Sequence, residues 1–513
     1  MKYSKLVHNF LEDSAAKYPD KDALFVNDKW YTYSYINERA NQTARFLIDQ
    51  GVRPGDRIAF YLENSAEYVI TYYGVLKAGA VTAALNTELT ADNVSYILED
   101  CGVKFLFSNP KSFRRIKSVL DTDQLTDFAI WADPQKVKIK SEKVNIHYLP
   151  EAVNSLPGEN TALKIVDLDL ASIVYTSGST GKPRGAVLSH LNIVTNTRSI
   201  VDYLELTHDD RILDILPFYY IYGKSLLNTH FFAGGSVVVD NRFLYPNVVL
   251  KTMQEQKATG FSGVPSTFTI LLNRSNIRSL KFDYLRYVTQ AGGAMAPAVQ
   301  KDVAKVFSPA KLFIMYGATE ASARLSYLPP EELERKWGSI GIGIPNVDLF
   351  VADSQGRRLA PGEQGEIAAR GANIMQGYWN HPEETRKVLK HGLYYTGDLG
   401  TMDEDGFIYV VGRSKDMIKI GGNRASGKEI EDAIYEHEAV ADAAVIGVAD
   451  EIMGEVPKAF IVLKEADGGG ADEEVLKTFL KDRLASYKMP KYFEFRESLP
   501  KNKSGKIQKL KLS

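Results

Sequence analysis

The strongest candidate for chemistry is a segment rich in glycine and hydroxyl groups, YTSGSTGKPRGAVLSH, at residues 175–190. Its glycines allow several backbone N–H groups to converge on one ligand, and its serine and threonine hydroxyls are further donors. Lys182 and Arg184 add positive charge. These groups suit the phosphate chain of a nucleotide. The same composition also occurs in exposed surface loops, so the segment alone leaves both interpretations open.

The spacing of this segment excludes the P-loop of nucleoside triphosphatases. A P-loop has four residues between its first glycine and the Gly-Lys pair, and a serine or threonine after the lysine. Here two residues intervene, and Pro183 follows Lys182. Because proline removes a backbone donor and restricts its neighbour, a helix directly after the lysine is not expected.

Four further segments contain polar residues of the kinds that bind nucleotides. They are YGATE at 316–320, YTGD at 395–398, GRSKDMIK at 412–419 with EIE at 429–431, and PKNKSGK at 500–506. Together with residues 175–190 they resemble, in the same order, the motifs of the adenylate-forming superfamily. That superfamily includes acyl-CoA synthetases, luciferases and the adenylation domains of nonribosomal peptide synthetases. The resemblance covers residues 31–506, and five ordered motifs make chance a poor explanation.

The resemblance implies an ATP site made from most of these motifs. Tyr316 is expected to stack on adenine, with residues 292–294 on its other side. Asp398 is expected to accept hydrogen bonds from both ribose hydroxyls, which suits a carboxylate with two acceptor oxygens. The implied ATP-binding residues are Thr176, Ser177, Gly178, Ser179, Thr180, Gly181, Lys182, Gly293, Ala294, Tyr316, Gly317, Thr319, Asp398 and Arg413.

The catalytic residues implied by the resemblance are Lys506, Thr176 and Glu320. Glu320 is the expected Mg²⁺ ligand, since magnesium bound to ATP takes few protein ligands and many phosphate oxygens. Adenylation brings a carboxylate against the α-phosphate, and Lys506 between the two anions would offset their repulsion. The lysines around Lys506 are expected to be solvated surface residues. Lys415 is the expected hinge about which a C-terminal domain rotates between half-reactions.

The acid site implied by the resemblance lies beside residues 217–223. Many acyl- and aryl-CoA ligases have histidine where this chain has Tyr220, whose uncharged ring favours an apolar or aromatic acid. Amino-acid-activating domains have an aspartate shortly afterwards, but residues 223–228 contain no acid, which disfavours an α-amino acid. The expected acid-binding residues are Tyr220, Gly223, Ser262, Val264, Gly293, Met315 and Ala318.

The expected reaction converts an acid and MgATP to acyl-AMP and then to an acyl thioester. Its cofactors are ATP, Mg²⁺ and coenzyme A, or the phosphopantetheine of an acyl carrier protein. Gly427 stands where the family often has proline, and a looser backbone there is a reason to doubt free CoA as the acceptor. Transfer to a carrier protein or an amine, a luciferase-like oxygenase and an inactive nucleotide-binding regulator are the alternatives. The joint presence of Glu320 and Lys506 argues against the inactive regulator.

The remaining sequence predicts the elements that position these motifs. Helical apolar spacing at 36–50 and 67–78 alternates with short apolar runs at 57–61 and 80–85, which favours α/β layers. Short β-like runs between 343 and 408 predict a β-rich subdomain. The tail is predicted to form helices at 428–436 and 472–484, strands at 443–448 and 458–464, and a loop at 468–470.

The predicted fold class is α/β, with a large N-terminal domain and a small mobile C-terminal domain. Residues 1–413 are expected to bind AMP and the acid, and residues 414–513 to carry the catalytic lysine. A chain of 513 residues is too long for one core. The net charge of −2 gives no reason to expect nucleic acid, and Cys101 alone can form no intrachain disulfide. No signal peptide or membrane-spanning stretch is apparent, so a cytoplasmic location is expected.

Overall fold

The computed structural model describes residues 5–121, 123, 125–176, 183–413, 416–420, 423–464, 471–501 and 506–512. The chain divides into two compact units. Unit 1 comprises Met1–Asn241, Ala318–Arg324 and Gly371–Lys387, and unit 2 comprises Arg242–Gly317, Leu325–Arg370 and Val388–Ser513.

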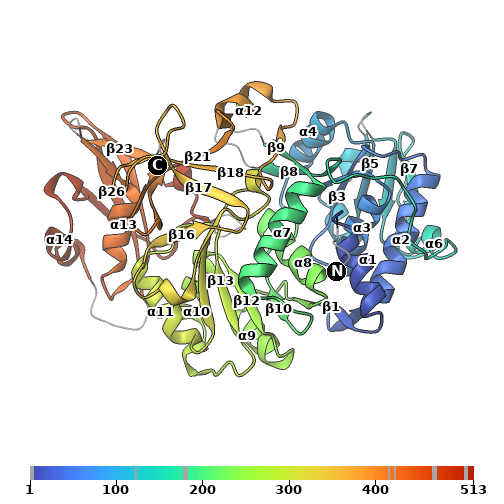
Figure 1. Ribbon diagram of the computed structural model, residues 1–513, viewed down its shortest axis with the longest axis horizontal. Coiled ribbons are helices and arrows are strands. Elements are labelled where there is room, and N and C mark those ends of the chain that lie inside the picture. Colours follow the sequence, from blue (N-terminus) through green and yellow to red (C-terminus); the bar gives the residue numbers. More distant parts are fainter. Residues whose placement is uncertain are drawn as a thin grey trace. The chain divides into compact units, whose positions relative to one another are not determined.

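An eight-stranded sheet is the centre of unit 1 (Figure 1). Its order is β19 (Gly377–Tyr378), β9 (Arg184–Ser189), β8 (Leu170–Thr176), β4 (Val81–Ala84), β3 (Arg57–Tyr61), β5 (Phe105–Ser108), β6 (Asp127–Ile130) and β7 (Asn145–Tyr148). The strands from β8 to β7 are parallel, whereas β9 is antiparallel to both of its neighbours. The carboxyl ends of the parallel strands therefore meet at one edge, where α/β sheets bind their ligands.

Helices α2 (Tyr33–Asp49) and α3 (Ala66–Lys77) pack against each other in this unit. Each begins at a residue whose side chain caps the helix, because the hydroxyls of Thr32 and Ser65 accept backbone N–H groups of the first turn. Unit 1 also contains the helices α1 (Asn9–Lys17), α4 (Ala91–Cys101), α5 (Pro110–Phe113), α6 (Leu149–Val153), α7 (His190–Leu204), α8 (Ile221–Ala233) and, up to Lys387, α12 (Pro382–Val388).

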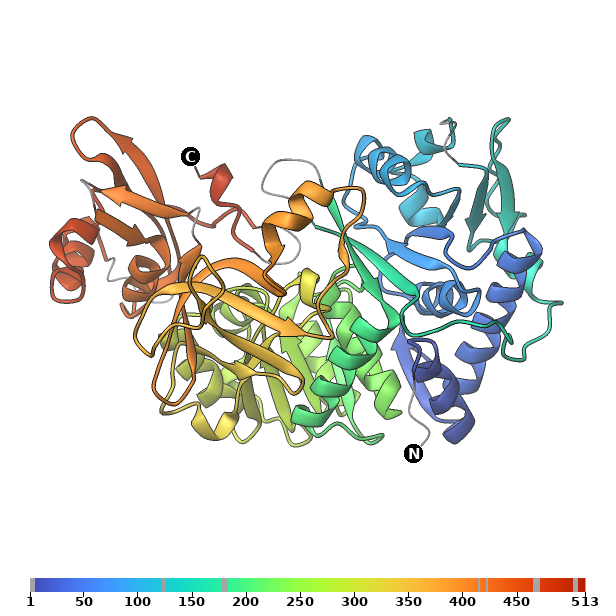
Figure 2. The same ribbon diagram turned by 45° about the horizontal axis from the view of Figure 1, so that its top comes forward.

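A second run of strands in unit 1 is covered by α8. It has the order β10 (Arg211–Asp214), β11 (Ser236–Val239), β1 (Asp22–Val26) and β2 (Lys29–Thr32). Helix α8 contacts β10 and β11 and also packs against α7, beside which it lies in Figures 1 and 2. Almost every residue of α8 is buried, so its polar side chains must find partners inside the protein.

Unit 2 contains two sets of strands. The first has the order β17 (Val347–Ala352), β18 (Gly365–Gly371), β21 (Leu393–Met402), β22 (Ile408–Arg413), β16 (Ser339–Gly343), β15 (Ser326–Leu328), β14 (Lys311–Tyr316), β13 (Tyr287–Gln290) and β12 (Gly260–Gly263), and β20 (Leu389–Lys390) pairs with β21. The helices α9 (Pro246–Glu255), α10 (Pro265–Arg274) and α11 (Pro297–Phe307) complete the connections before the C-terminal part.

The second set is a five-stranded sheet formed by the C-terminal part of the chain, coloured orange to red in Figure 2. Its order is β24 (Asn423–Ser426), β23 (Met417–Ile420), β26 (Gly454–Leu463) and β25 (Val440–Asp450), with β27 (Tyr492–Phe495) also on β26. Helices α13 (Gly427–Tyr435) and α14 (Glu473–Lys481) share one hydrophobic core with this sheet. This core is separate from those of the other strands, so the C-terminal part has the core of a small domain.

These elements agree well with the sequence-based expectations. The helix predicted at 36–50 is α2, the strand predicted at 57–61 is β3, and the β-rich segment contains strands β16 to β22. The helix predicted at 472–484 is α14, but it ends at Lys481. The glycine loop at 468–470 lies outside the described residues.

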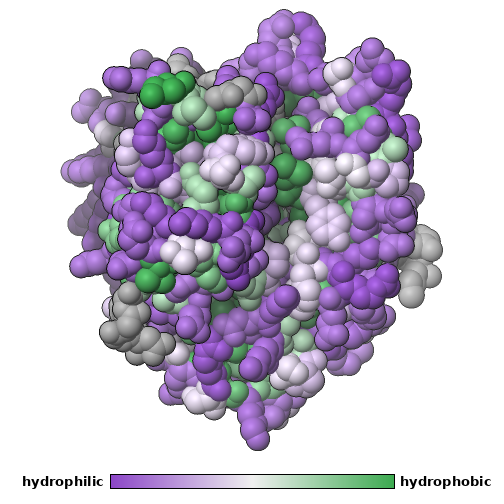
Figure 3. All heavy atoms as spheres, turned by 90° about the vertical axis from the view of Figure 1, so that its left-hand side faces the viewer, coloured by the Kyte–Doolittle hydropathy of each residue, from purple (hydrophilic) through white to green (hydrophobic). Residues whose placement is uncertain are grey.

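Hydrophilic side chains predominate on the face of the molecule shown in Figure 3, and hydrophobic ones are scattered over it. Within the described part of the chain, no helix has the length and apolar character needed to cross a membrane.

Candidate active site

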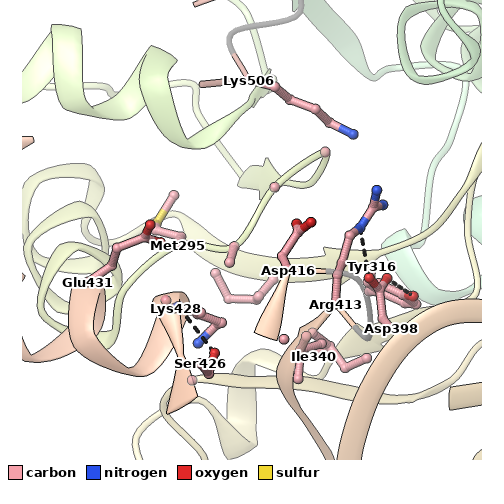
Figure 4. Close-up of a pocket in the computed structure, with 18 of the residues that line it drawn as sticks. Met295, Tyr316, Ile340, Asp398, Arg413, Asp416, Ser426, Lys428, Glu431 and Lys506 are labelled. Carbon is pink, nitrogen blue, oxygen red and sulfur yellow. Dashed lines mark hydrogen bonds and ion pairs between the residues drawn. The ribbon is translucent and has the colours of Figure 1, made fainter. Parts of the chain in front are cut away.

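One cavity of unit 2, with a volume of about 320 Å³, gathers many of the residues that the motifs single out (Figure 4). Strand β14 contributes Tyr316, which ends the strand, and the following Gly317. Strands β21 and β22 contribute Asp398 and Arg413, which are direct partners in the register of the two strands. The predicted site residues that line the cavity are Gly293, Ala294, Met315, Tyr316, Gly317, Asp398, Arg413 and Lys506.

The Asp398 carboxylate is held from two sides. The Tyr316 hydroxyl donates to Asp398 Oδ2 at 2.5 Å, and Arg413 Nε donates to Asp398 Oδ1 at 3.0 Å. Burial, and secondly the Asp398 charge, raise the pKa of Tyr316 well above its ordinary value, so this phenol stays a hydrogen-bond donor. Gly397 has φ +79°, a left-handed conformation that turns the chain just before Asp398. The result is an oriented carboxylate at the wall of the cavity.

The glycine segment opposite this carboxylate follows β13 directly. Gly292 has φ +85°, and Gln290 Nε2 donates to the Gly293 carbonyl at 2.8 Å. Gly293 and Ala294 line the cavity with backbone and a methyl group only. This part of the wall therefore carries no bulky side chain at Gly293 or Ala294.

Glu320 lies in unit 1, beside the base of the predicted phosphate loop. It belongs to the short helix η3 (Thr319–Ala321), and its Oε1 accepts a hydrogen bond from the Tyr378 hydroxyl at 2.7 Å. Tyr378 is on β19, which pairs with β9, the strand that follows the loop. On β9, Arg184 is ion-paired with Glu384 at 2.8 Å. Burial, and secondly the Glu320 charge, raise the pKa of Tyr378, which keeps this hydroxyl a donor.

The phosphate loop itself is bracketed by paired residues. Thr176, the last residue of β8, is the register partner of Arg184 on β9, and its hydroxyl donates to the Arg184 carbonyl at 3.5 Å. The predicted phosphate contacts Ser177, Gly178, Ser179, Thr180, Gly181 and Lys182 lie outside the described residues, as does the predicted hinge Lys415.

Two asparagines hold the strained backbone that follows Glu320. Ser322 and Ala323 have φ values of +57° and +127°, which non-glycine residues rarely adopt. Asn373 Nδ2 donates to the carbonyls of Ala321 and Arg324 at 3.1 and 3.0 Å, and Asn196 Nδ2 donates to that of Arg324 at 2.8 Å. The sequence analysis missed both asparagines, because no local motif links them to the YGATE segment.

Three of the predicted acid-binding residues lie in unit 1. Tyr220 is the residue before α8, and its hydroxyl accepts a hydrogen bond from Asn86 Nδ2 at 3.2 Å. At Gly223 a Cβ atom would lie 2.5 Å from the Pro217 carbonyl oxygen, so a close backbone approach already requires glycine there. Ala318 immediately precedes η3.

The other four predicted acid-binding residues lie in unit 2. Gly293 and Met315 line the cavity already described. Ser262 is fully buried on β12, and its hydroxyl is 2.6 Å from that of Thr289 on β13. Val264, also buried, directly precedes helix α10.

Lys506 reaches the cavity from the C-terminal tail, with its side chain directed into the cavity in Figure 4. The tail folds back on itself, because Gln508 N–H donates to the Pro500 carbonyl at 2.8 Å and Lys501 pairs with Ile507. Lys506 directly precedes Ile507, which forms an antiparallel bridge with Lys501. Residues 502–505 lie outside the described residues.

Two neighbours of Lys506 correct the expectation that the surrounding lysines are solvated. Lys501 Nζ lies 2.5 Å from Asp442 Oδ2, and Lys509 Nζ lies 2.6 Å from Glu431 Oε1. Lys509 also donates to the Val445 carbonyl at 3.0 Å. The expectation was wrong for these two residues because their carboxylate partners, on β25 and α13, are distant in sequence. The two ion pairs fasten the tail on both sides of Lys506.

Gly427 also differs from its expectation. It is buried as the first residue of α13, and a Cβ atom there would lie 2.9 Å from the Val445 carbonyl oxygen and 3.4 Å from Lys509 Nζ. The position is closely packed, so the prediction of a looser backbone was wrong. Glycine suits this position because a Cβ atom would lie too close to the Val445 carbonyl oxygen of the neighbouring strand.

Comparison with protein families gives this geometry a context. Residues 11–379 match the AMP-binding enzyme family, and residues 429–506 match the AMP-binding enzyme C-terminal domain. The chain belongs to this family of AMP-binding enzymes, which confirms the resemblance seen in the five motifs.

Individual relatives are similar over nearly the whole chain. A long-chain-fatty-acid–CoA ligase of Bacillus subtilis (strain 168) is 35% identical, covering 99% of this chain and 94% of the relative. A feruloyl-CoA synthase of Amycolatopsis sp is 34% identical, covering 93% and 92%.

Solved structures also match over nearly the whole chain. The anthranilate CoA ligase AuaEII in complex with anthranoyl-AMP has a TM-score of 0.90 and 26% identity, covering 100% of this chain and 97% of the other. ATP-bound MatB from Rhodopseudomonas palustris has a TM-score of 0.86 and 29% identity, covering 99% and 98%. The expected α/β fold, with a large N-terminal and a small C-terminal domain, is confirmed; the boundary expected at residue 413 stays a prediction.

Proposed function

We propose that this protein is an AMP-forming ligase that joins a carboxylic acid to coenzyme A through an acyl-adenylate. The observation that carries the proposal is the cavity of unit 2, where Tyr316, Asp398, Arg413 and Lys506 converge in a chain of the AMP-binding enzyme family. This constellation combines a site for a nucleoside with the Lys506 ammonium, which the C-terminal tail directs into the same cavity. Such a site suits reaction at the α-phosphate of ATP.

The first half-reaction forms a mixed anhydride. A carboxylate oxygen of the acid attacks the α-phosphorus of ATP, and pyrophosphate leaves with the electron pair of the broken P–O bond. Lys506 supplies a positive charge where two anions approach each other, which stabilises the transition state. In the second half-reaction the thiol sulfur attacks the acyl carbon and AMP leaves, carrying the bridging oxygen.

The nucleoside end of ATP is assigned to the wall of the cavity. The Asp398 carboxylate, oriented by Tyr316 and Arg413, would accept hydrogen bonds from the ribose hydroxyls. The Gly293–Ala294 backbone and the Tyr316 ring would enclose the adenine. The phosphates are assigned to the loop between Thr176 and Arg184.

The donor set around Glu320 fits a magnesium ion bound to ATP. Within the described residues no group of three or more His, Cys, Asp or Glu side chains could hold a metal, so a site made wholly of protein ligands is not found there. Glu320 offers one carboxylate, fixed by the Tyr378 hydroxyl, which suits a metal whose other ligands are phosphate oxygens and water. Magnesium bound there would neutralise phosphate charge.

The acid is proposed to be apolar or aromatic along its body. The relatives named above use a long-chain fatty acid, ferulate or anthranilate according to their names. Tyr220 presents an uncharged aromatic ring, which favours such an acid. Replacing Tyr220 by alanine would then shift the preference toward bulkier acids.

Coenzyme A is the acceptor that the relatives support. The reason for doubting it was a loose backbone at Gly427, and the close packing of that glycine removes this reason. A carrier protein or an amine is the alternative acceptor.

A screen of acids for pyrophosphate release, run with and without CoA, tests the proposal. We expect release that needs an acid, ATP and a divalent ion, and acyl-CoA whenever CoA is present. Pyrophosphate without any CoA thioester would point to the other acceptors, and no pyrophosphate with any acid would contradict adenylation.

A further inference from the structure

A stripe of polar side chains runs along one face of the buried helix α8. Tyr220 precedes the helix, and Lys224 and Asn228 follow at intervals of four residues, which places the three side chains on the same face. The Lys224 N–H donates to the Tyr220 carbonyl at 3.0 Å, so the helical turn between them is regular. The stripe is unusual because the helix is otherwise packed into the core of unit 1.

The stripe faces strands β4 and β8, and β8 is the strand that precedes the phosphate loop. The Tyr220 hydroxyl bonds to Asn86, just after β4, and Lys224 Nζ donates to Ser172 Oγ on β8 at 3.3 Å. Ser172 pairs with Thr82 on β4, well before the carboxyl ends of both strands. Tyr220 is therefore level with the ligand-binding edge of the sheet, and Lys224 lies deeper in the unit.

Lys224 has no acidic partner among the described residues. Its relative exposure is 1%, and its Nζ also lies 5.4 Å from the centroid of the Tyr72 ring. Asn228 donates to the Tyr72 hydroxyl at 3.3 Å, but its Oδ1 atom is buried and has no hydrogen-bond partner among the residues that the structure describes. Burial lowers the pKa of Lys224 to about 7. An isolated buried ammonium is costly, and this cost falls when a ligand brings an oxygen acceptor.

A second buried lysine of unit 1 shows what a purely structural lysine looks like in this chain. The Lys77 side chain is fully buried, and its Nζ lies 2.7 Å from Glu12 Oε1. It also donates to Asn37 and Asn160 at 2.9 and 3.1 Å. Lys77 is thus neutralised and fully hydrogen-bonded, whereas Lys224 has one hydroxyl partner and no counter-ion in the described part of the chain.

We propose that Lys224 is a specificity-determining residue that binds an oxygen-bearing group, above all a carboxylate, at the far end of the acid. This inference rests on the proposed function. Lys224 is one helical turn, about 6 Å, beyond Tyr220. The acid would pass Tyr220 with its apolar or aromatic body and place its distal oxygens at Lys224 and within reach of the polar groups around Asn228. The substrate class is therefore an acid with a polar distal end.

Matched pairs of acids test this inference. Pyrophosphate release is measured for hexanoate against adipate and for cinnamate against para-carboxycinnamate, with the wild type and with Lys224→Met, which keeps an unbranched chain. We expect the wild type to favour the acid with the distal carboxylate in kcat/KM, and Lys224→Met to reduce that preference at least about tenfold. Lys136→Met, which removes an exposed lysine of the same unit, is the control and should leave the preference unchanged.

Two results would overturn the inference while leaving adenylation intact. One is a wild-type kcat/KM for each apolar acid that equals or exceeds the value for its carboxylate-bearing partner. This result can be obtained without any variant. The other is a folded Lys224→Met that slows both members of each pair equally, as a structural lysine would. If no acid releases pyrophosphate at all, it is the proposed function that fails, and the inference falls with it.

Discussion

At the scale of single residues, Lys506 carries the most specific role, because it is the cation that the tail directs into the cavity lined by Tyr316 and Asp398. We expect Lys506→Ala to slow acid-dependent pyrophosphate release by at least roughly 10²-fold, the scale of losing one preorganised charge-stabilising group. Thioester formation from supplied acyl-AMP should remain nearly intact, since that step no longer brings two anions together.

Lys511 supplies the matched control for this variant. It is an exposed lysine of the same tail, so Lys511→Ala removes the same charge without entering the cavity. Equal slowing by both variants, or equal slowing of both half-reactions by Lys506→Ala, would contradict the assigned role.

Glu320 gives a second prediction at this scale. Glu320→Gln keeps an acceptor for the Tyr378 hydroxyl but removes the negative charge, so the Mg²⁺ concentration needed for half-maximal pyrophosphate release should rise at least about tenfold. Glu383→Gln, which alters an exposed carboxylate on α12, is the control. An unchanged magnesium requirement for Glu320→Gln would show that this carboxylate only supports Tyr378.

Site residues could be predicted from the sequence where a contiguous motif contains them. Tyr316, Asp398, Arg413 and Lys506 each stand in such a motif, and the structure gathers them in one cavity. Lys224 could not be predicted, because its significance depends on burial without a counter-ion. A buried lysine and an exposed one look the same in a sequence.

At the scale of elements, the C-terminal tail needs its two ion pairs to present Lys506. Lys509→Met removes the partner of the partly buried Glu431 and should lower kcat for pyrophosphate release about tenfold, with a smaller change in the KM for ATP, because Lys506 is displaced while the nucleoside contacts remain. Lys509→Arg should restore most of the rate. Steady-state kinetics of the two variants measure this.

A matched ion pair on the same helix separates positioning from general stability. Lys488 lies 2.6 Å from Glu429 on α13 but is not part of the tail. If Lys488→Met lowers kcat as much as Lys509→Met does, or if Lys509→Arg fails to restore activity in a folded protein, the tail contact has no special role in positioning Lys506.

Most elements could be predicted from local patterns, since α2 and β3 follow from apolar spacing and flanking turns. Pairings between distant segments could not. The contact of β19 with β9 places Tyr378 opposite Ala186, and the contact of the tail with α13 and β25 encloses Gly427. Both contacts join segments that are far apart in the sequence, so a local sequence pattern cannot predict them.

At the scale of the whole molecule, one enzyme must run two half-reactions with different needs. The family resemblance assigns the change between them to a rotation of the C-terminal domain about Lys415, which lies outside the described residues. Lys415→Pro should therefore leave pyrophosphate release near normal and impair thioester formation, because proline restricts the backbone at the hinge. Slowing of both half-reactions to the same extent would contradict a hinge at this position.

The central claim is that the acid is activated at the α-phosphate of ATP, and an isotope label tests it most directly. An acid whose carboxyl oxygens carry a heavy oxygen isotope is incubated with the protein, ATP, Mg²⁺ and CoA, and the products are analysed by mass spectrometry. One carboxylate oxygen bridges to phosphorus and leaves with the nucleotide, so we predict one labelled oxygen in AMP. The acyl thioester should keep the other labelled oxygen, and the pyrophosphate should carry no label. Formation of ADP with the label in inorganic phosphate would contradict the account.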